Sequence, residues 1–151
     1  MFGNERAAGG EDEDGREQPR VLYTGTGRRY LLQMLDQFGE FAHRSGEWIY
    51  LDPSLCTPCS RAVQRANQYG DRPVLLVVDA QKVSDELKYE GEYKVRGLSL
   101  GSFLPYELHS DENGKIPASD FESIKAVEEY LIGSTVDEVR QGTQRTLHRL
   151  P

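Results

Sequence analysis

The chain has 151 residues, 25 of them acidic and 18 basic, which gives a formal net charge of -7 at neutral pH. That length favours one domain around a single core, and the acidic balance argues against a general nucleic-acid-binding protein, which needs a basic face. Two cysteines cannot make the disulfide framework of a small secreted protein, and no apolar run approaches the ~18 residues of a membrane span. We therefore expect a cytoplasmic protein that does not enter a membrane.

The first 20 residues combine acidic side chains with Gly-containing breaks. Their six acidic and three basic residues give a net charge of -3, and they lack the basic-then-apolar order of a signal peptide. Charge with few apolar residues is typical of disorder. We therefore predict a disordered acidic tail over residues 1–20 and a single globular domain over residues 21–151.

The globular part opens with an alternation of strands and helices. A strand at 21–26 precedes leucines at helical spacing, and this helix is predicted to end at Gly39, which supplies a left-handed stop. A short aromatic strand follows at 48–51, because Pro53 cannot extend a ladder. The next helix is predicted over 58–69.

The second half begins with the most apolar segment of the chain. Residues 74–78 are five apolar side chains in succession, a pattern that predicts a central strand buried on both faces. A further strand, made irregular by its glycines, is predicted from the alternation of Tyr93, Val95, Leu98 and Leu100. Two capping boxes, each a hydroxyl residue followed three positions later by Glu, predict helices beginning near Ser119 and Thr135, the second interrupted at Gly142.

Three segments in the first half carry patterns that occur together in one enzyme superfamily: Tyr23-Thr-Gly-Thr26, Trp48-Ile-Tyr-Leu-Asp-Pro-Ser54 and Arg72-Pro-Val-Leu-Leu-Val-Val-Asp-Ala80. Over residues 21–105 the chain resembles the catalytic lobe of the ADP-ribosyltransferase superfamily, with its RNA 2'-phosphotransferase branch the most similar. The resemblance implies an α/β or α+β fold with a mixed, curved sheet flanked by helices. It also implies NAD as the cofactor, and an unidentified protein or nucleic-acid end as the acceptor of ADP-ribose.

The resemblance implies roles for the residues of the first two segments. Gly25 would let the backbone approach the nicotinamide amide, because a β-carbon there would obstruct that contact. Tyr50 would stack on the nicotinamide ring, and Thr26 would support the adenosine side or the turn itself. Tyr23 and Thr24 complete the implied cofactor-binding turn. The same turn is also typical of a plain strand end in which Thr26 caps the next helix.

Charged residues would supply the chemistry implied by the resemblance. Glu92 is the preferred carboxylate for stabilising the positive charge that develops on the ribose, with Glu90 as its neighbour. Arg65 and Arg96 are candidates for binding phosphate. Since Thr24 stands where the RNA 2'-phosphotransferase branch has His, we do not expect removal of an RNA 2'-phosphate. A non-catalytic domain that binds a nucleotide or a partner protein is a second alternative.

The sequence Cys56-Thr-Pro-Cys59 supports a different enzyme class. It follows a predicted strand and opens a predicted helix, as in a thioredoxin-like thiol-disulfide oxidoreductase, where Cys56 would attack and Cys59 would resolve the mixed disulfide. Against this, Leu98 follows the later Arg-Gly pair where thioredoxins have a cis-proline. A zinc set with His43 or His109 matches poorly in spacing, and we predict no metal site.

Overall fold

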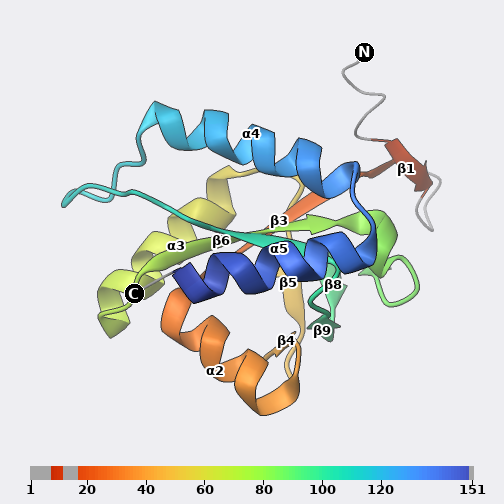
Figure 1. Ribbon diagram of the computed structural model, residues 1–151, viewed down its shortest axis with the longest axis horizontal. Helices are drawn as coiled ribbons and strands as arrows, with labels where there is room; N and C mark the ends of the chain where they lie inside the picture. The colour runs from red at the N-terminus through yellow and green to blue at the C-terminus, as the bar shows by residue number, and fades with distance from the viewer. Residues whose placement is uncertain (1–7, 12–16, 150–151) are drawn as a thin grey trace.

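The protein has a mixed α/β fold in the computed structural model, which describes residues 8–11 and 17–149 (Figure 1). The predicted α/β class is confirmed. The strand pairs among the described residues are antiparallel. Among these residues, none of the helices has the length and hydropathy of a bilayer-spanning segment.

The central sheet has three strands in the order β10-β6-β3. They are β3 (Val21–Gly27), β6 (Pro73–Asp79) and β10 (Phe103–Glu107). Alternate side chains of β6 enter two separate hydrophobic clusters, one on each face of the sheet. The prediction of a central strand at 74–78 buried on both faces is therefore confirmed.

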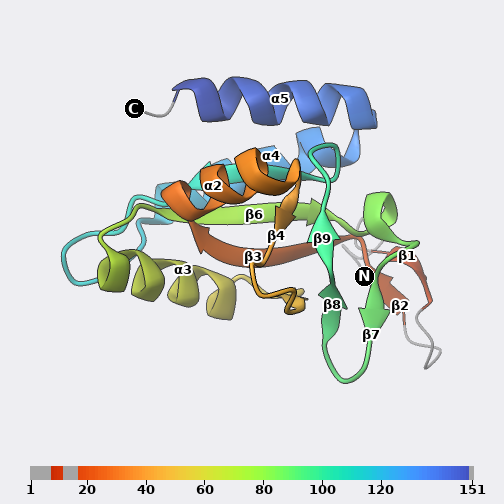
Figure 2. The ribbon, with the colours of Figure 1, turned by 90° about the horizontal axis from the view of Figure 1, so that it is seen from below.

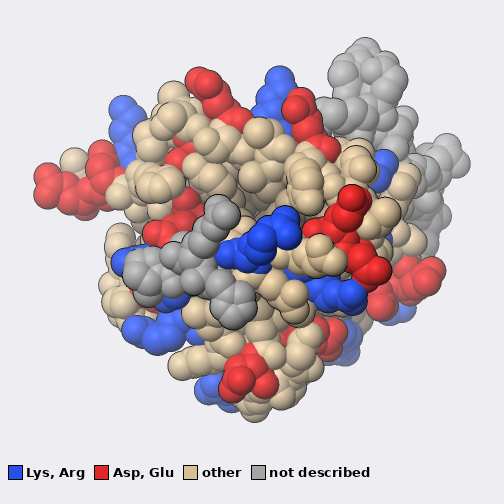
Figure 3. Space-filling model, in the orientation of Figure 1, with Lys and Arg blue, Asp and Glu red and all other residues tan. Residues whose placement is uncertain are grey.

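Four helices pack around this sheet in the described part of the chain. They are α2 (Arg28–Phe38), α3 (Cys56–Tyr69), α4 (Ala118–Ile132) and α5 (Val136–Arg149). Figure 2 shows α2 and α3 on opposite faces of β3 and β6. The α4 helix shares the cluster on the α3 face, and α5 packs against β10. The surface over α4 and α5 intersperses acidic and basic side chains (Figure 3).

A second sheet contains the shorter strands. It has the order β5-β8-β7, with β5 (Ile49–Leu51), β8 (Tyr93–Val95) and β7 (Lys88–Tyr89). The predicted strand at 48–51 is confirmed within one residue. The strand predicted from Tyr93 toward Leu100 is divided, because β8 ends at Val95 and residues 97–98 pair with another strand. Two smaller elements complete this region: the pair β4 (Phe41–Ala42) and β9 (Gly97–Leu98), and the 3-10 turn η1 (Ala80–Val83) after β6.

The amino-terminal residues of the described chain form a hairpin instead of a fully disordered tail. The strands β1 (Ala8–Glu11) and β2 (Glu17–Pro19) pair antiparallel, although the sequence predicts disorder over residues 1–20. Backbone pairing does not require apolar side chains, which is why the composition did not reveal it. The rest of the predicted tail lies outside the described residues.

Helix ends follow the local signals with one exception. The α2 helix ends at Gly39 (φ 74°), in the left-handed conformation expected of a glycine stop. The capping box at the start of α5 is confirmed, because the Glu138 N–H donates to Thr135 Oγ1 at 3.1 Å and the Thr135 N–H donates to Glu138 Oε1 at 2.8 Å. The box predicted at Ser119 is wrong, since Pro117 is the N-cap residue of α4 and no side chain caps that helix.

Two features of the carboxyl-terminal half differ from the expectations. The strand β10 was not predicted, because it contains Pro105; at the edge of a sheet, the missing N–H of proline can face the open side. The α5 helix is not interrupted at Gly142. That residue is buried where α5 packs on β10, and the Thr143 hydroxyl nearby donates to Phe103 O at 2.8 Å.

Candidate functional site

The two sheets are joined by an isolated bridge between β3 and the end of β5. Tyr23 and Asp52 exchange two backbone hydrogen bonds of 2.9 Å there. Past this bridge the strands separate, because β3 continues to pair with β6 while β5 pairs with β8. The divergence leaves an opening that α3 borders.

Two pockets of 300 and 240 Å³ occupy this opening. Both are lined by Thr24, Gly25, Tyr50 and Arg61, so they form one continuous site, which we call the fork groove. Its main walls are Thr24, Gly25, Trp48, Tyr50, Arg61 and Glu92. Figure 2 shows β3 and α3, two of the elements that contribute lining residues, side by side.

The fork groove brings together several of the residues singled out in the sequence. Thr24 and Gly25 come from β3, Tyr50 from β5, Arg65 from α3, and Glu92 from the turn between β7 and β8. The ring of Tyr50 is 44% exposed, which leaves it accessible to a ligand. Gly25 and Tyr50 therefore line the same groove.

Gly25 has a packing role that the sequence did not show. A β-carbon at this position would lie 2.1 Å from Pro58 O and 2.9 Å from Ala62 Cβ. Real β-carbons do not approach a backbone oxygen so closely, so α3 can pack against β3 only because residue 25 is a glycine. The glycine thus sets the position of the helix that forms one wall of the groove.

Tyr23 and Thr26 lie outside the groove. The Tyr23 side chain points into the cluster shared with α4, where its hydroxyl donates to the Glu128 carboxylate. Thr26 is 2% exposed, and its hydroxyl meets no partner within the described part of the chain. It does not cap α2, whose N-cap is Gly27. Strand alternation places Tyr23 on the opposite face of β3 from Thr24, whereas Thr26 shares the face of Thr24 but is buried.

Glu90 and Arg96 are also outside the groove. Glu90 is an exposed residue of the β7–β8 turn that pairs with Lys94, and the hydrogen bond from Lys94 lowers the pKa of Glu90. Arg96 stacks on Trp48, with its Cζ 3.8 Å from the ring centroid, and donates to Gly46 O at 2.6 Å. Arg96 therefore helps to hold Trp48, one wall of the groove, in position.

Most of the polar wall formed by α3 was not predicted from the sequence. Arg61, Gln64, Arg65 and Gln68 line the groove, at the i, i+3, i+4 and i+7 spacing of one helix face. This spacing is readable in the sequence, but only the apolar face of the same helix entered the prediction. This face of α3 places two guanidinium groups and two amides along one side of the opening.

The charges at the two ends of the groove differ in sign. Asp52 and Glu92 line one of the two pockets and Arg65 lines the other, whereas Arg61 lines both. His43 also lines the groove. Burial is the largest effect on the pKa of His43 and lowers it; the Arg65 charge lowers it further, whereas the Glu47 charge raises it. The groove can therefore receive an anionic group at one end and an electron-poor or cationic group at the other.

The two cysteines occupy the start of α3. Cys56 is its first residue and is exposed, Cys59 is buried one turn later, and both thiols are free. Burial raises the pKa of Cys59 to about 11, and the charges of Asp120 and Cys56 add to the shift. Thr57 and Pro58, which lie between the two cysteines, line the fork groove.

The histidines weighed as zinc ligands have other contacts. His43, which lines the groove, has its Nδ1 atom 3.0 Å from the Tyr30 hydroxyl. His109 Nδ1 is 2.8 Å from Asp120 Oδ1. Within residues 8–11 and 17–149, no group of three or more His, Cys, Asp or Glu side chains is placed to hold a metal ion.

Comparisons with known proteins identify a distant structural neighbour. No protein-family model and no curated protein matches the chain. The crystal structure of protein CC0527 from Caulobacter crescentus is similar over 68% of this chain and 98% of its own length, at 19% sequence identity and a TM-score of 0.45. A similarity at this level identifies neither a family nor an activity.

Proposed function

We propose that the protein binds NAD in the fork groove, cleaves the bond between nicotinamide and ribose, and transfers ADP-ribose to an acceptor on a protein or a nucleic-acid end. The observation that carries the proposal is the convergence of Gly25, Tyr50 and Glu92 on one open groove from three separate elements. Two of the three segments that resemble the ADP-ribosyltransferase superfamily, those at 23–26 and 48–54, contribute walls of this groove.

Each wall of the groove has a role in the proposed reaction. Tyr50 stacks on the nicotinamide ring, and Arg61 with Arg65 holds the diphosphate by charge-assisted hydrogen bonds. When the glycosidic bond breaks, its electron pair leaves with nicotinamide and positive charge develops on the ribose. The Glu92 carboxylate stabilises that charge, and the acceptor nucleophile then bonds to the same ribose carbon and loses its proton.

The Glu92→Gln variant tests the chemistry directly. Removing one preorganised electrostatic group lowers a rate by about 10²- to 10³-fold, so we expect that loss in nicotinamide release, with NAD binding nearly unchanged. The matched control is Glu90→Gln, on the same turn but outside the groove, which should keep wild-type activity. Nicotinamide release is followed with labelled NAD, and NAD affinity by calorimetry.

Three outcomes distinguish the alternatives. Equal losses in the two variants would contradict the role of Glu92. Absence of NAD binding by the wild-type protein would contradict the proposed function as a whole. NAD binding that weakens in Tyr50→Ala, but without nicotinamide release in the wild type, would support the non-catalytic nucleotide-binding alternative, in which the Thr24 substitution for His leaves a pocket without turnover.

Thiol-disulfide exchange is a second candidate, favoured by the position of the two cysteines. An exposed Cys56 at a helix start with a buried Cys59 one turn away is the arrangement that this chemistry uses, because the helix terminus stabilises a thiolate. If the candidate is correct, the wild-type protein accelerates the reduction of insulin by dithiothreitol, and Cys56→Ser does not. Equal inactivity of both proteins would exclude it.

A further inference from the structure

A third pocket continues the fork groove beyond α3. It has a volume of 320 Å³ and lies between the first turn of α2 and the end of α3. We call it the tyrosine pocket, and it is lined by Arg29, Tyr30, Gln33, Arg65, Tyr69 and Asp71. Arg65 and Tyr69 also line the fork groove, so the two sites share a wall and form one track.

Two tyrosine rings and one guanidinium group define the pocket. Arg65 Cζ is 4.7 Å from the centroid of the Tyr30 ring and 5.7 Å from that of Tyr69. The Tyr30 ring is held in place by an edge contact with Phe41 at 6.1 Å and by the hydroxyl contact with His43. Tyr69 is 59% exposed, so one of its sides is available for stacking.

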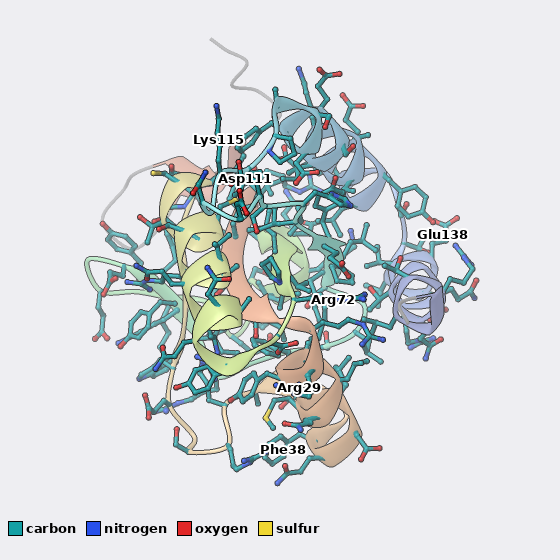
Figure 4. All side chains as sticks on the ribbon, turned by 90° about the vertical axis from the view of Figure 1, so that its left-hand side faces the viewer. Arg29, Phe38, Arg72, Asp111, Lys115 and Glu138 are labelled. Carbon is teal, nitrogen blue, oxygen red and sulfur yellow. The ribbon has the colours of Figure 1, made fainter. Side chains whose placement is uncertain are left out.

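The walls of the pocket are connected by hydrogen bonds between α2 and the end of α3. Asp71 accepts from the Arg29 N–H through both carboxylate oxygens, at 2.9 and 3.1 Å. The Arg29 guanidinium in turn donates to Tyr69 O at 2.8 Å. Figure 4 shows Arg29 at the start of α2, next to the last turn of α3. These hydrogen bonds fix the start of α2 against the end of α3 at the pocket wall.

The chemistry of the track differs between its parts. Glu92, Tyr50 and Arg61 line one end together, and Arg65 and Tyr69 lie where the fork groove adjoins the tyrosine pocket. An electron-poor ring with its ribose fits the first group, a diphosphate fits the arginines, and a second flat heterocycle fits the tyrosine pocket. A dinucleotide likewise carries one heterocycle on each side of a central diphosphate.

We propose that the tyrosine pocket binds the adenine base of an adenine dinucleotide, with Tyr69 stacking on the base and Arg65 at its junction with the diphosphate. The assignment to NAD rests on the proposed function of the fork groove, whereas binding of an ADP moiety does not. The Gln33 amide at the pocket wall carries both a donor and an acceptor, which matches the N6 and N7 groups of adenine.

The experiment separates the two halves of the track by ligand and by variant. ADP-ribose carries the adenine half without nicotinamide, and nicotinamide mononucleotide carries the other half. Loss of a base-stacking aromatic weakens binding by about tenfold or more, so Tyr69→Ala should weaken ADP-ribose by that factor and leave nicotinamide mononucleotide within about twofold of wild type. Tyr69→Phe should retain affinity for both ligands. Tyr130→Ala, which removes another exposed helical tyrosine, is the matched control.

The outcomes keep this inference distinct from the proposed function. Unchanged ADP-ribose binding by Tyr69→Ala, equal weakening of both ligands, or no ADP-ribose binding by the wild type would overturn the adenine site. ADP-ribose binding that depends on Tyr69, in a protein that neither binds nicotinamide mononucleotide nor cleaves NAD, would support the adenine site while removing the proposed activity.

Discussion

Replacing Asp79 by asparagine is expected to destabilise the protein by about 3–5 kcal/mol, the usual cost of removing one partner from a buried ion pair. Asp79 is fully buried at the end of β6, where it accepts from Arg20 Nε at 2.9 Å and from Lys82 Nζ at 2.6 Å. Both cations also reach α4, through Ile132 O and Leu131 O respectively. The variant would leave these two largely buried charges without their carboxylate. Urea unfolding measures the difference.

An exposed ion pair provides the control for this variant. Asp137 pairs with Arg140 on the surface of α5, and exposed pairs contribute little to stability. We therefore expect Asp137→Asn to leave the unfolding midpoint nearly unchanged. If Asp79→Asn were as stable as Asp137→Asn, the network around Asp79 would not hold β6 and α4 together.

The same network predicts how stability depends on pH. Burial alone would raise the pKa of Asp79, but the hydrogen bonds and charges of Arg20 and Lys82 hold it below its ordinary value. A carboxyl group with a depressed folded-state pKa stabilises the fold above its unfolded pKa of about 3.9, and this contribution is lost as the pH falls toward the folded value. As the pH falls below about 5, the wild type should therefore lose more stability than Asp79→Asn.

Replacing Gly25 by alanine is expected to cost about 1–3 kcal/mol of stability and to weaken ligand binding in the fork groove. The added β-carbon would meet Pro58 O at 2.1 Å, and a backbone oxygen cannot rotate away as a side chain can. The start of α3 must shift instead, and Arg61 and Arg65 shift with it. Thermal unfolding and calorimetry with NAD measure the two effects.

Gly142→Ala is the matched control, and its expected change in the free energy of unfolding has the opposite sign. Gly142 lies inside α5, and a β-carbon there would be 3.4 Å from Leu104 Cδ2, an ordinary contact distance. Since alanine favours a helix over glycine by about 0.5–1 kcal/mol, this variant should be at least as stable as the wild type. A Gly25→Ala protein that matched wild type in both stability and binding would show that α3 does not depend on close contact with β3.

The sequence by itself determined those elements whose signals are local. Gly39 ends α2, Thr135 with Glu138 begins α5, and the apolar run of β6 identifies the centre of the sheet. In each case the physical cause lies within a few residues: a left-handed glycine, a reciprocal pair of hydrogen bonds, or continuous burial. β10 was missed because its tolerance for Pro105 depends on its place at the sheet edge.

Only the tertiary structure decided which candidate residues share a site. Thr24 faces the fork groove while Tyr23 and Thr26 do not, and Glu92 lines it while Glu90 pairs with Lys94 in solvent. Whether a residue lines the fork groove depends on strand alternation, on the point where β3 and β5 separate, and on how closely α3 approaches Gly25. These are contacts between segments distant in sequence, so residue spacing suggested the chemistry of the groove, whereas packing determined its walls.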